Sequence, residues 1–137
     1  MHYFTIAFYN TENFFDPFDN ERKHDGDYTP NGSRKWTEKR YEEKVRKIGQ
    51  AIHLIGMEET HQPPLIVGLA EIENKKVLHD LVHSEFLDEF NYEYVHFESL
   101  DERGVDTALL FRQEFLELLD KRIIRSTFPG DFTRDIL

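Results

Sequence analysis

The sequence contains no cysteine and no long apolar run, and each absence excludes a class of protein. Without cysteine, the chain can have no disulfide scaffold, no thiolate zinc site and no cysteine nucleophile. The longest strongly apolar stretch, residues 65–70, is far too short to span a membrane. The first residues lack the basic segment and apolar core of a signal peptide, so we expect a cytoplasmic protein.

Basic residues are outnumbered by acidic ones: 17 Lys and Arg stand against 27 Asp and Glu, a formal net charge of −10 over 137 residues. A chain this acidic does not bind polyanions through bulk charge, so handling a phosphate requires a local basic patch or a metal ion. The 39% of hydrophobic residues, among them 12 Phe, are enough to build a core. The length fits one modest domain or part of a larger one.

The hydrophobic patterns predict an α/β fold in which helices flank a mixed β-sheet. The predicted strands are residues 2–9, 65–70, 92–97, 107–111 and 115–124, and the predicted helices are residues 38–55 and a second helix that Asn74 caps. Both faces of the first strand are largely apolar, which indicates a strand between two layers. The first helix is expected to bury one face, formed by Tyr41, Val45, Ile48, Ile52 and Ile55.

Polar residues follow the first two predicted strands directly. Asn10 and Glu12 come after the first strand, and Glu71 comes after the second. A right-handed β-α-β crossover makes these strands parallel neighbours, so their carboxyl ends share one edge of the sheet. Oxygen ligands of this kind suit Mg²⁺ or Mn²⁺. The simpler interpretation, an ordinary solvated residue at the end of a strand, stays open for Glu71 taken alone.

Three segments of the chain carry a family resemblance. Residues 7–16 read AFYNTENFFD, residues 68–74 read GLAEIEN, and residues 96–112 read HFESLDERGVDTALLFR. In this order they resemble motifs of the endonuclease/exonuclease/phosphatase superfamily, the metal-dependent phosphohydrolases with the fold of deoxyribonuclease I. Residues 36–41, which read WTEKRY, are similar to a bacterial branch of this superfamily.

The resemblance implies a role for five residues. Asn10 matches the residue that positions the phosphate or the nucleophilic water, and Glu71 matches the principal metal ligand. Glu12 falls where the superfamily often has an acidic residue near the metal. Arg103 and Asp106 lie in the block that lines the substrate side, with supporting roles in phosphate contact and orientation. The implied reaction is metal-assisted in-line attack of water on a phosphodiester, most readily that of nucleic acid.

The later motifs of the superfamily, which activate the water and bind the phosphate, have no counterpart in these residues. We therefore expect residues 1–137 to be the N-terminal part of the domain, half of a four-layered α/β sandwich. We expect this part to be catalytically weak or inactive alone, and to self-associate through an exposed sheet face. The alternative from another class is a non-catalytic interaction module that retains the fold.

Two other segments have features of a metal site. His79 and His83 imitate the H-E-x-x-H zinc helix, but Asp80 replaces the Glu and no third ligand is evident, so surface histidines are the preferred interpretation. Residues 16–27 are rich in Asp but do not follow the order of an EF-hand, so a solvated acidic loop is preferred there.

A basic segment begins just before the first helix. Between positions 34 and 47, seven Lys and Arg residues outnumber three Glu, and Trp36 lies among them. This segment either guides a phosphate backbone, with Trp36 stacking on a base, or forms a solvent-facing helix with ion pairs such as Glu43 with Lys47.

Overall fold

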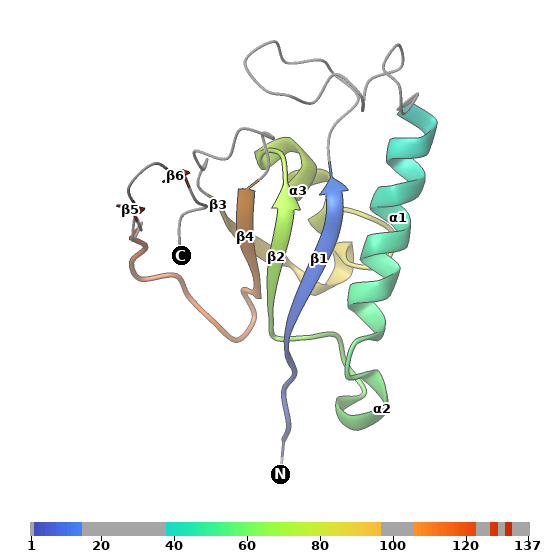
Figure 1. The fold of residues 1–137 in the computed structure, drawn as a ribbon. Coiled ribbons are helices and arrows are strands. Elements are labelled where there is room, and N and C mark those ends of the chain that lie inside the picture. The colour runs from blue at the N-terminus through green and yellow to red at the C-terminus, as the bar shows by residue number, and fades with distance from the viewer. Residues whose placement is uncertain (1, 15–37, 97–105, 123–126, 129–130, 133–137) are drawn as a thin grey trace.

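The computed structural model describes residues 2–14, 38–96, 106–122, 127–128 and 131–132, and its centre is a mixed four-stranded sheet (Figure 1). The strands of this sheet are β1 (Ile6–Phe14), β2 (Ile66–Ile72), β3 (Tyr92–His96) and β4 (Asp106–Arg112), in the order β1-β2-β4-β3. β1 and β2 are parallel, and β4 is antiparallel to both of its neighbours. The predicted α/β fold with a mixed sheet is confirmed.

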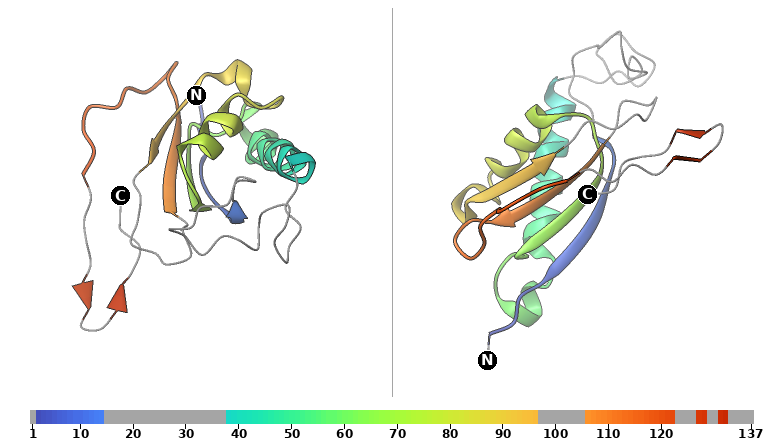
Figure 2. Two further views of the ribbon diagram at one scale, coloured as in Figure 1. Left: turned by 90° about the horizontal axis from the view of Figure 1, so that it is seen from above. Right: turned by 90° about the vertical axis from the view of Figure 1, so that its left-hand side faces the viewer.

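Two helices cover one face of the sheet (Figure 2). They are α1 (Glu38–Leu54) and α3 (Lys75–Val82), and the short helix α2 (Met57–Thr60) follows α1. The Asn74 side chain caps α3 by accepting a hydrogen bond from the Val77 N–H at 3.1 Å, as predicted. In the described part of the chain, no helix is long and apolar enough to cross a membrane.

The core lies between these helices and the sheet. The predicted stripe of α1 is buried at Tyr41, Val45, Ile48 and Ile52. It packs with side chains from the other elements that face the same layer, namely Val77, Leu78, Leu81 and Val82 of α3 and Phe14, Val67, Leu69, Ile72, Ala108 and Leu110 of the sheet. Burial of this apolar stripe, rather than intrinsic helix propensity, is what fixes α1 on the sheet.

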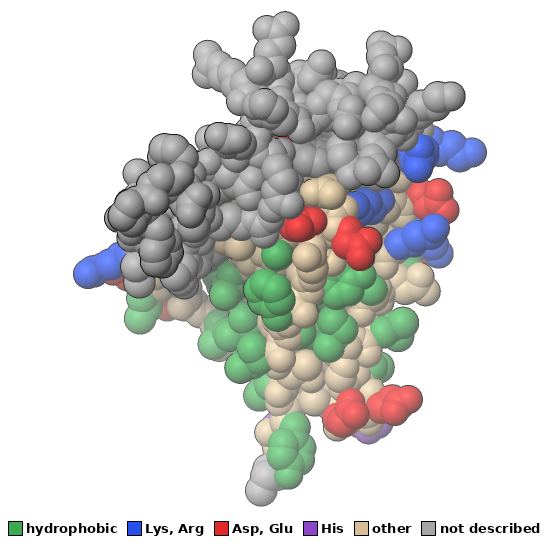
Figure 3. All heavy atoms as spheres, in the orientation of Figure 1, with side chains coloured by type: hydrophobic (Ala, Val, Ile, Leu, Met, Phe, Trp, Pro, Cys, Tyr) green, Lys and Arg blue, Asp and Glu red, His purple; other side chains and the backbone are tan. Residues whose placement is uncertain are grey.

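The opposite face of the sheet exposes apolar side chains. Ile6 and Phe8 of β1 are 73% and 72% exposed, and the Phe8 ring lies across Gly68 of β2. Phe4 contacts Phe115 edge to face at 5.2 Å between ring centroids. Figure 3 shows hydrophobic side chains gathered over this face. Among the described residues, β1 is therefore covered by helices on one face only, and the predicted exposure of apolar side chains is observed.

The first two strands extend further at their carboxyl ends than predicted. β1 begins at Ile6 rather than His2, and it continues past Asn10 to Phe14. β2 continues through Glu71 to Ile72. Both strands continue because the polar residues at their carboxyl ends lie in an irregularly paired part of the sheet and not in a loop.

The predicted strand at residues 115–124 is wrong over the part that the structure describes. The chain turns after β4, where the N–H groups of Phe115 and Leu116 both donate to the Arg112 carbonyl at 3.1 Å, and residues 116–122 form no strand. Because β4 is already paired with β2 and β3, it has no free edge for a hairpin partner. A separate two-stranded sheet is formed by β5 (Thr127–Phe128) and β6 (Asp131–Phe132).

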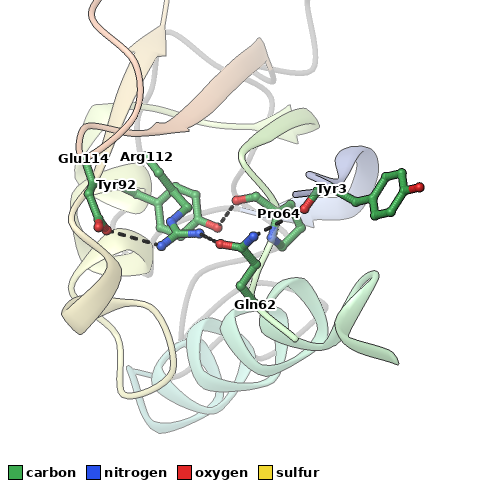
Figure 4. A network of polar contacts seen from close by, with 6 residues as sticks. All are labelled: Tyr3, Gln62, Pro64, Tyr92, Arg112 and Glu114. Carbon is green, nitrogen blue, oxygen red and sulfur yellow. Dashed lines mark hydrogen bonds and ion pairs between the residues drawn. The ribbon is translucent and has the colours of Figure 1, made fainter. Parts of the chain in front are cut away.

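A polar network closes one end of the sheet (Figure 4). The buried Arg112 guanidinium donates to Gln62 Oε1 at 2.8 Å and to Glu114 Oε2 at 3.4 Å, and Gln62 Nε2 donates to the Tyr3 carbonyl at 3.3 Å. The Tyr92 hydroxyl donates to the Pro64 carbonyl, and burial raises the pKa of Tyr92. These contacts join the N-terminal segment to β3 and β4, at the end opposite to the carboxyl ends of β1 and β2.

Candidate active site

Where the carboxyl ends of β1 and β2 meet, the pairing between the two strands is irregular. Asn10 pairs with Ala70, but the next paired residues are Phe14 and Ile72, so β1 advances four residues while β2 advances two. Backbone conformation changes at the same place: φ is 54° at Glu12, 57° at Asn13 and 64° at Glu71. Such left-handed conformations are uncommon outside glycine and cluster at functional sites.

Side-chain hydrogen bonds replace the missing strand pairing. Thr11 Oγ1 lies 2.8 Å from the Ala70 carbonyl oxygen and 3.1 Å from that of Glu71. The Asn13 N–H donates to Glu71 Oε2 at 2.8 Å, and the Glu12 N–H donates to Asn10 Oδ1 at 2.9 Å. The two polar strand ends are therefore tied to each other through side chains.

Lys44 of α1 reaches the same place from the helix layer. Its Nζ donates to the Glu12 carbonyl at 2.6 Å and to the Asn13 carbonyl at 3.3 Å. Burial lowers the pKa of Lys44, and the carboxylates of Glu12 and Glu71 partly oppose this shift. Lys44 thus hydrogen-bonds the backbone of β1 at the residue pair that contacts Glu71, and the charges of Glu12 and Glu71 both favour its ammonium form.

The structure brings three of the predicted site residues to one edge. Asn10 and Glu12 are exposed on β1, and the half-buried Glu71 lies beside them on β2. Asp106, opposite Ile72 at the start of β4, lies at the same end of the sheet but is buried. Arg103 lies outside the described residues.

Asp106 is paired with a histidine that carried no predicted role. His96 Nε2 and Asp106 Oδ2 are 2.9 Å apart, and both side chains are almost fully buried. The other ring nitrogen of His96, Nδ1, is buried without a hydrogen-bond partner. Asp106 therefore lies where it orients a neighbouring side chain of the sheet.

Two further residues of the site, Thr11 and Lys44, were missed by sequence reasoning. Thr11 lies between Asn10 and Glu12 in the first motif, so its position gave a signal although no role was assigned to it. Lys44 directly precedes the buried Val45 in the helical stripe, which places it beside the core face of α1. The carbonyl groups to which Lys44 donates, however, lie more than 30 positions away in the chain, so no local pattern indicated these hydrogen bonds.

Of the two alternative metal sites, the structure describes the pair of histidines but not the Asp-rich segment. The His79 and His83 rings are exposed, with centroids 4.5 Å apart, and His83 Nδ1 lies 3.1 Å from Asp88 Oδ1. They border an open groove of about 530 Å³ between α1 and α3. The Asp-rich residues 16–27 and Trp36 lie outside the described residues.

The donor set at the edge fits a hard divalent cation. Glu12 and Glu71 offer carboxylate oxygens, and Mg²⁺ needs no more than one or two carboxylates besides water and substrate phosphate. No group of three or more His, Asp or Glu within the described ranges is arranged to hold a metal. A cation at this edge would therefore be completed by water or by the substrate.

Comparison with models of protein families identifies the family to which this chain belongs. Residues 5–137 match the model of the Endonuclease/Exonuclease/phosphatase family, and the chain belongs to this family. Its members are hydrolases of phosphoesterase type and are generally dependent on a divalent metal. No curated protein and no solved structure matches the chain. The resemblance read from the three motifs is thereby confirmed.

Proposed function

We propose that this chain is part of a Mg²⁺- or Mn²⁺-dependent phosphodiesterase that hydrolyses the backbone of nucleic acid. Asn10 and Glu71 are its catalytic residues, with Glu71 and Glu12 as metal ligands. Arg103 and Asp106 support the substrate side. The observation that supports this most strongly is the hydrogen bond from the Asn13 N–H to Glu71 Oε2, which joins the two strand ends that carry the motifs.

Two hydrogen bonds at this edge orient Glu71 and Asn10 for the proposed reaction. The bond from Asn13 fixes the orientation of the Glu71 carboxylate before any ligand arrives. Asn10 Oδ1 accepts from the Glu12 N–H. In this proposal the Asn10 amide therefore uses its Nδ2 as the donor to a phosphoryl oxygen or to the attacking water. When bound, the metal supplies charge stabilisation on the phosphoryl and leaving oxygens.

A basic hollow beside the site supports nucleic acid as the substrate. Arg40, Lys44 and Lys47, together with Glu43, line a hollow of about 250 Å³ on α1. In Figure 3, Lys and Arg side chains gather along this part of α1. The hollow is a local positive region on an acidic chain, as contact with a phosphate backbone requires. The ion pair between Lys47 and Glu43, at 3.1 Å, weakens this region in part.

In this proposal, no residue of the described ranges is assigned to the activation of the attacking water. General acid–base groups typically contribute about 10²–10⁴-fold to the rate. Binding is therefore the better test. Fluorescence anisotropy of a labelled single-stranded oligonucleotide is expected to show binding in Mg²⁺ that EDTA and Asn10→Ala both weaken. Equal binding in Mg²⁺ and in EDTA would contradict the proposal.

The exposed sheet face favours a second candidate, a non-catalytic interaction module. Ile6 and Phe8 present an apolar surface of the kind that marks association sites. This candidate predicts no divalent cation binding at Glu71, so a metal titration distinguishes it from the phosphodiesterase.

A further inference from the structure

Lys44 places a positive charge inside the candidate metal site. Its ammonium group donates to the carbonyls of Glu12 and Asn13, the two residues of β1 with left-handed backbone conformations. The carboxylates of Glu12 and Glu71 both interact with it electrostatically. Lys44 also lies over the Phe14 ring, with Nζ 5.6 Å from the centroid, so its stem is held against the core.

Lys47, one turn further along α1, has none of these contacts. It is exposed and pairs with Glu43 of the same helix at 3.1 Å. Such exposed pairs contribute little to stability. The comparison shows that the position of Lys44 is a property of its site and not of basic residues on α1 in general.

An ammonium group at this place has two opposing effects. Without a divalent ion, it compensates the two carboxylates and satisfies two carbonyls of the β1 irregularity. A divalent ion held by Glu12 and Glu71 would be repelled by the like charge of this ammonium group, which weakens cation binding. A site built in this way keeps its shape when empty and holds its metal loosely.

We propose that Lys44 is a positioning residue that acts as an internal cation: it holds the β1–β2 edge in shape and sets the affinity of the site for its divalent metal. This inference rests on the proposed function, since it assumes that Glu71 and Glu12 bind a cation. It adds a residue of the helix layer to the site, with a role that opposes metal binding while preserving the site.

The test is a calorimetric titration of the full 137-residue chain with MnCl₂, together with thermal unfolding in EDTA. Lys44→Gln removes the charge and keeps a hydrogen-bond donor. It is expected to lower the melting temperature in EDTA and to tighten Mn²⁺ binding on the order of tenfold at low salt. The gain in affinity should shrink as salt is raised, because salt screens charge repulsion. Lys44→Arg and Lys47→Gln should both retain the wild-type affinity.

Each outcome decides the matter. A folded Lys44→Gln variant that binds Mn²⁺ with unchanged or weaker affinity overturns the inference, while loss of binding in Glu71→Gln still supports the proposed function. Wild-type chain that binds no Mn²⁺ overturns both. If Lys44→Gln is unfolded in EDTA, the inference predicts that Mn²⁺ refolds it, and failure to refold counts against the inference.

Discussion

The N–H of Asn13 donates a 2.8 Å hydrogen bond to Oε2 of Glu71, which lies 58 positions further along the chain. This bond joins two backbone segments that both adopt left-handed conformations. Such conformations cost about 1–3 kcal/mol each and persist where surrounding contacts hold them. The carboxylate of Glu71 therefore supports the shape of the edge that presents it.

Thr11 is expected to be the main structural support of that edge. Thr11→Val keeps the shape of the side chain but leaves the buried carbonyls of Ala70 and Glu71 without their hydroxyl partner. We expect a loss of about 1–3 kcal/mol in the free energy of unfolding, measured with urea, and weaker Mn²⁺ binding.

Thr60→Val is the matched control for Thr11. Its hydroxyl lies 3.0 Å from two carbonyl oxygens, those of Gly56 and Gln62, in the α2 region. This variant should lose stability without any change in Mn²⁺ affinity. Equal effects of the two variants on metal binding would show that Thr11 does not support the site.

The buried pair of His96 and Asp106 is expected to stabilise the sheet. Asp106→Ala leaves His96 Nε2 buried without its acceptor and should cost about 1–3 kcal/mol of unfolding free energy. Asp106→Asn retains an acceptor oxygen and should cost less. Urea denaturation of the two variants provides the comparison, and an equal loss in both would contradict a hydrogen-bonding role.

Asp80 is expected to make stability depend on pH. Burial raises the pKa of this carboxyl, but hydrogen bonds from Lys76 and Tyr41 outweigh burial and leave the pKa lowered. A lowered folded-state pKa stabilises the fold above the unfolded value of about 3.9, and this contribution is lost as pH falls through the folded pKa. Asp80→Asn should therefore be less stable than wild type at pH 7, with the gap closing below about pH 4.

Tyr41→Phe provides the control for this pH dependence. It removes the 2.6 Å hydrogen bond to Asp80 Oδ2 while keeping the ring in the core. The stability lost by wild type on acidification should be reduced in this variant. Unfolding curves that respond to pH equally in all three proteins would rule out a contribution from Asp80.

The exposed sheet face is expected to drive self-association. Phe8→Ser removes an exposed ring and should weaken association, measured by light scattering over a concentration series, with little change in stability. Leu54→Ser, at an exposed position of α1, should leave association unchanged. A wild-type chain that stays monomeric at all concentrations would contradict this prediction.

Regular elements could be predicted from the sequence, because periodic burial leaves a periodic pattern. The stripe through Tyr41, Val45 and Ile48 gave α1 almost to its last residue, and Asn74 gave the start of α3. The parallel pairing of β1 and β2 followed from the crossover rule. The edge that gathers Asn10, Glu12 and Glu71 could be placed for the same reason.

The details of the site could not be predicted, because they depend on contacts between distant segments. No local pattern indicates that Glu12, Asn13 and Glu71 are left-handed, since side-chain bonds across the two strands hold them there. The strand predicted at residues 115–124 failed for a similar reason: whether β4 has a free edge depends on the pairing of the whole sheet.

The most direct test of the account is titration of the full chain with Mg²⁺ and Mn²⁺, comparing wild type with Glu71→Gln. Glu58→Gln in α2, at the opposite end of the sheet, controls for the loss of one acidic charge. The account predicts that Glu71→Gln weakens binding on the order of tenfold or more and that Glu58→Gln binds as wild type does. Equal affinity of wild type and Glu71→Gln would contradict a metal site at this edge.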